Sequence, residues 1–206
     1  MLTNVDHLSS KRDRLQMKPK RQRRGIATVW VIVWTPAIFT LLIVVSDVAN
    51  VWQAKIELKT ALEASSLAGV QQWELDSGNL NDPRAVAVSA AFGNTIIGQP
   101  VVVFANGGGG GANENTSCTG NVVILGSIDR NVSPLVFNAG VAPSMANQDN
   151  LAVHVQATVQ VQSLWNAFGG FSFGPYDVSA EATARYVYGD TKPRLVSIAN
   201  SICPGP

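Results

Sequence analysis

The chain has 206 residues, a length for one modest domain or for one domain with a membrane anchor. Only 14% of its residues are charged, well below the roughly 25% of typical soluble domains. Two cysteines exclude a disulfide-rich scaffold and a four-cysteine zinc site, and two histidines leave little for histidine-based metal or triad chemistry.

The charge is divided unevenly along the chain. Residues 1–24 carry eight Lys and Arg against two acidic residues, and residues 25–206 carry seven against twelve, so the net charges are +6 and −5. This division argues against a nucleic-acid-binding protein with one broad basic surface. A basic tail in front of an apolar run is typical of a membrane topology signal, and Arg21, Arg23 and Arg24 lie nearest to that run.

Residues 25–46 are predicted to form a transmembrane helix. Ile26 to Ser46 contain no charged residue, and about 20 residues at a rise of about 1.5 Å cross a hydrocarbon core of about 30 Å. Pro36 predicts a kink, which membrane helices tolerate. The basic flank predicts that residues 1–24 are a cytoplasmic tail and that residues 47–206 lie outside. A cleaved signal peptide is the alternative, but the apolar run is long for one and no A-x-A-like site follows.

Residues 47–75 are predicted to continue this helix as an amphipathic, extracytoplasmic segment. Apolar and small residues recur every three or four positions, and Lys59 and Glu63 form an i,i+4 pair. Small residues allow a partner to approach the helix closely. That partner is either the chain's own sheet or a helix of another subunit, and the predicted packing stripe contains Val48, Val51, Trp52, Ala54, Leu58, Ala61, Leu62, Ser65 and Ala68.

Residues 76–206 are predicted to form a β-rich extracytoplasmic domain. Asp82 and Pro83 predict the start of a short helix over residues 84–94, and β-branched runs predict strands at 101–105 and 122–125. The five glycines at 107–111 predict a flexible loop, because no Lys-Ser or Lys-Thr pair follows as in a phosphate-binding loop. Alternating residues predict an antiparallel strand pair at 151–163 and 177–188, with one apolar, buried face and one polar face.

Few residues carry the pattern of a catalytic or metal-binding site. His154 is expected to be a solvated or hydrogen-bonded residue on the polar face of its strand. Asp47 is read as an interfacial residue or as the start of the outer helical segment, with positioning against a partner's helix as the alternative. The acidic residues of the outer domain are scattered without ligand spacing: Asp129, Asp149, Asp177, Glu181 and Asp190. The sequence therefore predicts no catalytic, cofactor-binding or metal-binding residues.

Cys118 and Cys203 are both expected outside, where oxidation is permitted. A disulfide between them would tie the end of the chain to the glycine-rich loop and add about 3–5 kcal/mol in the loop-entropy model. Two free thiols that lie too far apart are the alternative.

The stretch from Arg23 to about residue 71 resembles the N-terminal segment of the TadE/TadG-like proteins of the Tad (Flp pilus) apparatus. That segment has a basic-basic-Gly start, an apolar span with a proline, an acidic residue and an aromatic beyond it, and a helix ending in Leu-Ala-Gly. The residues here that fill these places are Gly25, Pro36, Asp47, Trp52, Leu58, Ala61, Ala64, Leu67, Ala68 and Gly69. The later strands and the aromatic segment around Phe168 also resemble the family's later pattern.

The resemblance implies a pilin-like α+β fold, in which a long transmembrane-plus-amphipathic helix packs on a small antiparallel sheet. It also implies a bacterial inner-membrane protein with a periplasmic domain, which acts in pilus assembly or as a pseudopilin. Two features depart from the family. Trp30 replaces the Glu that usually follows a prepilin cleavage site, which argues against cleavage after Gly25. The stretch Asp177-Val-Ser179-Ala-Glu181 lacks the second Ser of a von Willebrand A metal site.

We therefore expect a non-catalytic, single-span envelope protein of a Tad/Flp-type system, without cofactor. Its expected partners are the inner membrane and pilus assembly proteins or pilin-like subunits, with homo- or hetero-oligomers formed through the helix and no nucleic acid. Incorporation into a surface pilus is left open. A membrane-tethered periplasmic ligand-binding module is the alternative, and a largely apolar pocket with convergent polar groups would favour it.

Overall fold

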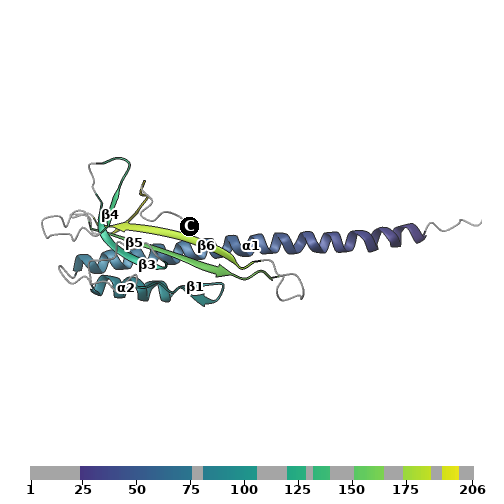
Figure 1. Ribbon diagram of the computed structural model, residues 1–206, viewed down its shortest axis with the longest axis horizontal. Coiled ribbons are helices and arrows are strands. Elements are labelled where there is room, and N and C mark those ends of the chain that lie inside the picture. Colours follow the sequence, from purple (N-terminus) through teal and green to yellow (C-terminus); the bar gives the residue numbers. More distant parts are fainter. Residues whose placement is uncertain are drawn as a thin grey trace, which may run out of the picture. The chain divides into compact units, whose positions relative to one another are not determined.

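The computed structural model describes residues 24–75, 81–105, 120–128, 132–139, 151–164, 174–186 and 192–199. The chain divides into two compact units, residues 1–43 and 44–206. The helix α1 (Arg24–Leu75) begins in the first unit and ends in the second (Figure 1).

In the first unit, α1 passes through Pro36 without a break, and almost every side chain is exposed. Two threonine hydroxyls in this apolar stretch donate hydrogen bonds to carbonyls of the same helix. Thr35 donates to the carbonyl of Val31 at 2.6 Å, and Thr40 donates to the carbonyl of Pro36 at 2.9 Å. Such hydroxyl-to-backbone bonds let a helix carry threonine where no water is at hand.

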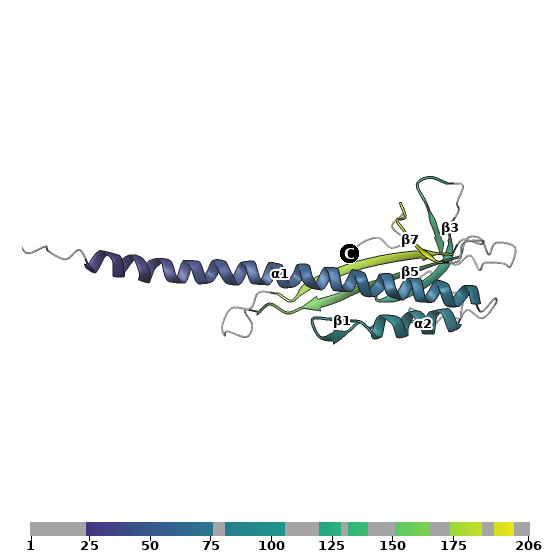
Figure 2. The same ribbon diagram turned by 180° about the vertical axis from the view of Figure 1, so that it is seen from behind.

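In the second unit, α1 and the shorter helix α2 (Asn81–Phe92) lie on one face of the sheet (Figures 1 and 2). α2 begins three residues before the predicted start. It ends where the side chain of Asn94 donates to the carbonyl of Ala90 at 2.7 Å, while the amide of Gly93 donates to the carbonyl of Ser89 at 3.0 Å. These bonds satisfy carbonyls that a helix end leaves open.

A short β-hairpin follows α2. Its strands, β1 (Thr95–Ile96) and β2 (Gln99–Pro100), have two residues each. Ile97 and Gly98 form its turn with φ of 49° and 77°, as a type I′ turn requires. The Glu57 carboxylate of α1 accepts hydrogen bonds from the Gln53 side chain and from the Ile97 amide, both at 2.8 Å. These two bonds, Gln53 first, hold the pKa of Glu57 below its usual value.

The strand predicted at 101–105 is wrong as an assignment. Val101 and Val103 are buried and Val102 is exposed, so burial alternates along this segment as it does in a strand. The segment lacks a ladder, however, because only Phe104 forms a single bridge, parallel to Val122. Alternation reports burial on one side and does not show that a neighbouring strand exists to pair with.

The main sheet has five strands in the order β4-β3-β5-β6-β7, and every neighbouring pair is antiparallel. Ten residue pairs join β5 to β6, from Ala152–Arg185 to Val161–Tyr176, which confirms the predicted antiparallel pair. The strand predicted at 122–125 extends further, to Ile128. The strands are β3 (Val122–Ile128), β4 (Phe137–Ala139), β5 (Leu151–Val161), β6 (Tyr176–Arg185) and β7 (Arg194–Val196).

Both faces of the sheet carry buried apolar side chains. The helix-facing side of β3 and β5 packs Val123, Val153 and Val155 against α1 and α2, with Leu58 and Leu62 among the fully buried residues. The opposite side has a smaller cluster, formed by Val122, Ile124, Ile128, Phe137 and Ala152. The expected polar face is therefore wrong for the first half of β5, because Leu135 and Phe137 cover it, and right for Thr158 and Gln160, which are exposed.

The overall class is α+β, with the long helix packed on a five-stranded antiparallel sheet, as expected.

Candidate interaction surface on the long helix

The small residues of α1 lie where the helix meets α2 and the sheet. The Ser65 hydroxyl donates to the carbonyl of Ala87 in α2 at 2.7 Å, and both groups are buried. A methyl group on Gly69 would come within 3.0 Å of the Ala87 Cβ and 3.3 Å of Val153 Cγ1. The glycine and serine therefore allow backbones to approach, as small residues do at helix interfaces. The predicted partners of this stripe were the chain's own sheet and a helix of another subunit. The structure shows it packed against the chain's own domain.

The structure distributes the motif residues over three settings. Gly25 and Pro36 lie in the exposed apolar part of the helix. Leu58, Ala61 and Gly69 are buried in the core, and Ala64, Leu67 and Ala68 are half-buried at its edge. Val48 and Trp52 were expected in the packing stripe, and this is wrong: they are 64% and 68% exposed. Ala54 and Leu58 are fully buried in the core, whereas Val48 and Trp52 lie outside it.

Asp47 joins α1 to the end of β5. The residue is only 7% exposed, and its carboxylate accepts a hydrogen bond from the Ser163 hydroxyl and one of 2.8 Å from the Leu164 amide. A buried carboxylate is tolerated when donors satisfy it, and hydrogen bonds to a charged group are worth more than neutral ones. These two hydrogen bonds hold the residues that follow β5 against α1.

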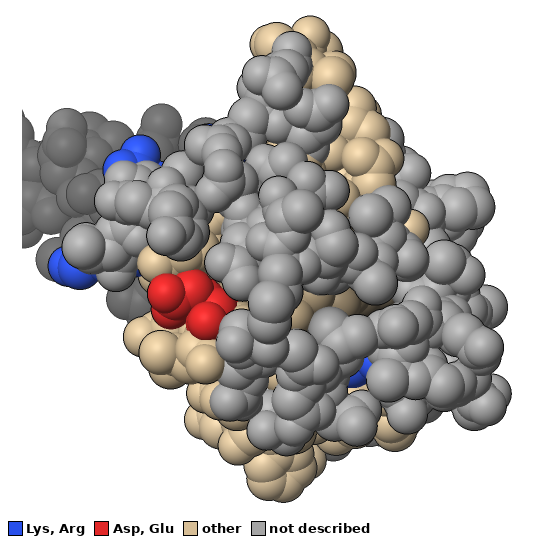
Figure 3. Space-filling model, turned by 90° about the vertical axis from the view of Figure 1, so that its left-hand side faces the viewer, with Lys and Arg blue, Asp and Glu red and all other residues tan. Residues whose placement is uncertain are grey.

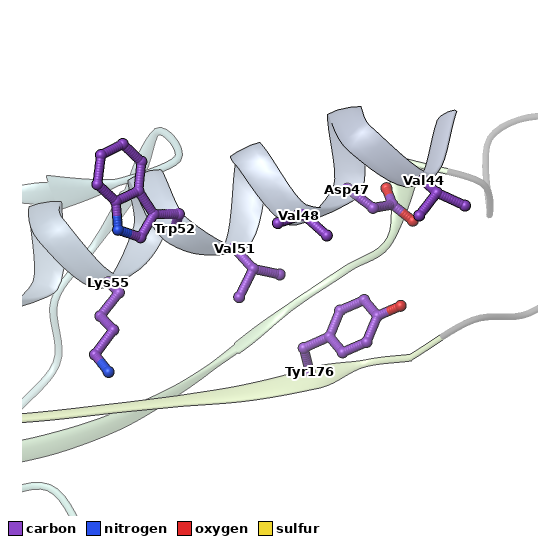
Figure 4. Close-up of a pocket in the computed structure, with 7 residues that line it drawn as sticks. All are labelled: Val44, Asp47, Val48, Val51, Trp52, Lys55 and Tyr176. Atoms are coloured by element: carbon purple, nitrogen blue, oxygen red, sulfur yellow. The ribbon is translucent and has the colours of Figure 1, made fainter. Parts of the chain in front are cut away.

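An apolar groove opens beside this contact, between α1 and the start of β6. It has a volume of about 520 Å³. Figure 4 shows the side chains of Val51, Lys55 and Tyr176 pointing into the space between the two elements, while Trp52 projects from another side of the helix. The groove is lined from α1 by Val44, Asp47, Val48, Val51, Trp52 and Lys55, and from β6 by Tyr176.

The apolar run of α1 is exposed along its length in the first unit. Ile26, Ile32, Phe39 and Leu41 are each more than half exposed. Trp30 and Trp34 stack on each other with ring centroids 6.1 Å apart. This helix is long and apolar enough to cross a membrane, and burying such a run in water-free surroundings is strongly favourable. It suggests a single membrane span.

His154 is fully buried, so of its two expected states the hydrogen-bonded one is confirmed and the solvated one is wrong. Its Nδ1 lies 2.8 Å from the Thr183 hydroxyl on β6, and its ring lies 5.7 Å from that of Phe137. Burial lowers its pKa to about 4, and a hydrogen bond with Gln156 acts weakly in the opposite direction. Glu181 lies 3.9 Å from Nε2, but its side chain is about half exposed and water screens its charge.

The charged surface of the described residues is sparse. Lys59 and Glu63 form the predicted i,i+4 pair at 3.8 Å. Figure 3 shows the molecule from the left-hand side of Figure 1, where one group of acidic side chains and small areas of basic ones are visible among the residues described. Within the described ranges, no group of three or more His, Cys, Asp or Glu residues could hold a metal ion.

Several predicted sites lie outside the described residues. These are Arg21, Arg23, the glycine run at 107–111 and both cysteines of the expected disulfide, Cys118 and Cys203. Arg24 is the first residue of α1. The disulfide and the role of the arginines in topology stay predictions.

Sequence reasoning missed the partners of Asp47, which lie 116 and 117 residues away. It also missed the contact of Glu57 with the hairpin and that of the Tyr186 hydroxyl, which donates to Glu74 at 3.0 Å. For Asp47 there was one signal: it is the first charge after a long uncharged run, on the helix face that later carries Ala54 and Leu58.

Neither the curated proteins nor the solved structures contain a match to the chain. A family model matches residues 25–72, which include both halves of α1 and every motif residue from Gly25 to Gly69. That family is described as putative Flp pilus-assembly TadE/G-like. The resemblance read from the sequence is thereby confirmed, and over residues 25–72 the chain matches the TadE/G-like Flp pilus-assembly family.

Proposed function

We propose that the chain is a non-catalytic, single-span envelope protein of a Tad/Flp-type pilus assembly system. In this proposal residues 1–24 stay in the cytoplasm, residues 25–46 span the inner membrane and residues 47–206 lie in the periplasm. The family match over residues 25–72 and the apolar helix support the pilus-assembly context and the span. The +6 charge of residues 1–24 supports the orientation.

One observation carries the proposal. The matched stretch is a single helix whose first part presents an exposed apolar surface and whose second part is built into the domain. A helix of this kind anchors a folded domain to a bilayer without a linker between them. The small residues Ser65 and Gly69 already pack inside the chain's own domain, where they contact α2. Contacts with assembly proteins or pilin-like subunits would therefore use other surfaces, among them the exposed apolar part of α1.

The experiment is a gene deletion in the bacterium that carries this chain, complemented by three forms of it. We expect deletion to abolish pili and the full-length chain to restore them. A form with Leu41 and Leu42 both changed to Arg should fail, because two charges in the apolar run block insertion. The matched control changes Gln71 and Gln72, outside the apolar run, to Arg and should restore pili. Normal pili in the deletion strain would reject the proposal.

The same strains separate two roles within the system. A pseudopilin-like subunit would be found in the sheared pilus fraction together with the main pilin. A component of the assembly complex would stay in the membrane and co-purify with the assembly platform. If the chain binds neither pilus nor platform while pili are still lost on deletion, its role lies outside fibre assembly.

A further inference from the structure

We propose that the groove between α1 and the start of β6 binds one phospholipid of the outer leaflet of the membrane that α1 crosses. Its acyl chain would enter the groove along Val44 and Val48, and its phosphate would lie between Val51 and Lys55. This inference rests on the membrane span and not on the role in pilus assembly. The residues that line the groove all lie within residues 44–206.

The first argument is the position of the groove along the helix. The uncharged run ends at Ser46, and the groove is lined from Val44 to Lys55. The polar layer of a bilayer adds about 5–8 Å on each side of its hydrocarbon core, which a helix crosses in about 3–5 residues. That layer therefore covers residues 47 to about 51. The groove begins at the hydrocarbon edge and continues through the layer in which phosphates lie.

The second argument is the exposure of large apolar residues in this layer and at its two edges. Val45, Val48 and Trp52 are 57%, 64% and 68% exposed, although they lie beside a folded domain. Trp52 comes at the outer edge of the layer, and Tyr176 presents its ring to the groove and carries a hydroxyl (Figure 4). Tryptophan and tyrosine with one apolar side and one polar atom are typical of the membrane interface.

The third argument is the placement of charge. Lys55 lies at the end of the groove away from Val44, as Figure 4 shows. Its side chain extends from the helix toward β6 in Figure 4, and its flexible four-carbon stem lets the ammonium meet a phosphate at the outer edge of the polar layer. The one acidic residue of the groove, Asp47, is two turns away and its carboxylate is held by Ser163 and Leu164. The groove thus pairs apolar walls with a cation at its outer end, just beyond the layer of phosphates, and a phospholipid has the same order of apolar and charged parts.

A second copy of α1 is the competing occupant, because an apolar helix face can also pack against another helix. The groove favours the lipid, since a lysine among its few polar residues would face the apolar side of a partner helix without a counter-charge. A lipid phosphate provides that counter-charge, and a flexible lipid follows the irregular wall formed by Val51 and Tyr176 more easily than a helix does.

The test is native mass spectrometry of the full-length protein, released from detergent micelles and titrated with dioleoyl phosphatidylglycerol or dioleoyl phosphatidylcholine. We expect one tightly held phosphatidylglycerol and a weaker phosphatidylcholine. Lys55→Gln should weaken binding of phosphatidylglycerol by about fivefold, the usual effect of one lysine near an anionic lipid surface. Lys59→Gln, the same change one turn away on an exposed lysine outside the groove, should leave binding unchanged.

The apolar wall has its own matched pair. Val48→Gln should weaken the binding of both lipids, whereas Ile56→Gln should not, because Ile56 is 48% exposed but does not line the groove. Circular dichroism shows whether each variant is folded. Equal loss with Lys55→Gln and Lys59→Gln would overturn the site in favour of unspecific attraction. Failure to retain any lipid would overturn it too, as would a dimer that Val48→Gln dissociates. Pili can be normal or absent in any of these outcomes, so failure here is distinct from failure of the proposed function.

Discussion

The contact between Asp47 and the end of β5 leads to a prediction that a local measurement can test. The Leu164 amide donates to the carboxylate of Asp47 at 2.8 Å, and Asp47 is 7% exposed. A hydrogen bond to a charged acceptor is worth about 1.5–3 kcal/mol. Removing that acceptor with Asp47→Ala should therefore speed hydrogen exchange of the Leu164 amide by about 10- to 150-fold, since about 1.4 kcal/mol is a factor of ten.

The conservative variant Asp47→Asn keeps an acceptor oxygen but loses the charge. The difference between a charged and a neutral acceptor is about 1 kcal/mol, so exchange should rise by only about fivefold. Ser163→Ala keeps the hydrogen bond from the Leu164 amide to Asp47. The exchange rate of that amide should therefore stay closer to that of the unchanged protein. The control is Asp177→Ala, which removes an exposed carboxylate at the start of the neighbouring strand.

The assay is hydrogen–deuterium exchange with mass spectrometry on the full-length protein in detergent micelles, followed for the peptide that contains Leu164. Unchanged exchange of this peptide in Asp47→Ala would refute the contact. An equal increase in every peptide of the domain would also refute it, because it would show a global loss of stability and not the release of one strand end.

Three further predictions concern stability, measured as the free energy of unfolding of the full-length protein in micelles. Gly69→Val should lower it by about 1–3 kcal/mol, because its side chain would press on Ala87 and Val153, whereas Gly25→Ala, with nothing within 4 Å, should lower it by nothing measurable. Gly126→Ala should be more harmful than Gly25→Ala, since the new Cβ would come within 2.6 Å of the Phe137 ring and still closer to the carbonyl of Asn138; equal midpoints for the two variants would contradict this packing. His154 has a folded pKa of about 4 against 6.5 unfolded, so the unfolded state binds the proton first and stability, complete above pH 6.5, should fall by about 3 kcal/mol as the pH drops to 4. His154→Gln should remove that slope, and a slope that persists in the variant would assign the pH dependence to other groups.

Local patterns predicted much of the fold. The uncharged run and the three- and four-residue spacing around Ala54 and Leu58 were enough to predict one long helix, because a helix places such residues on one side whatever surrounds it. The alternation of Val153 and Val155 likewise predicted β5 and its pairing with β6.

The features that were missed depend on segments distant in the chain. Alternation placed His154 on a polar face, but nothing near it in sequence shows that Phe137 would cover that face. Val101 and Val103 alternate like a strand, but only the folded chain shows that no neighbour completes a ladder there. The spacing of Val48 and Trp52 matched the packing stripe, yet the sheet lies beside only part of the helix circumference. The partners of Asp47 could not be inferred for the same reason, since Ser163 and Leu164 reach it only when β5 lies along α1.

The central claim is that the apolar part of α1 crosses the membrane and carries the remaining chain to its outer side. Protease treatment of spheroplasts expressing the chain with an N-terminal tag, after a carbonate wash of parallel membranes, tests it most directly. We predict that the chain stays in the washed membranes and that protease added outside leaves only a tagged fragment that extends to about residue 46. A chain released by carbonate, or a domain that resists protease until the spheroplasts are lysed although it is digested freely afterwards, would contradict the claim.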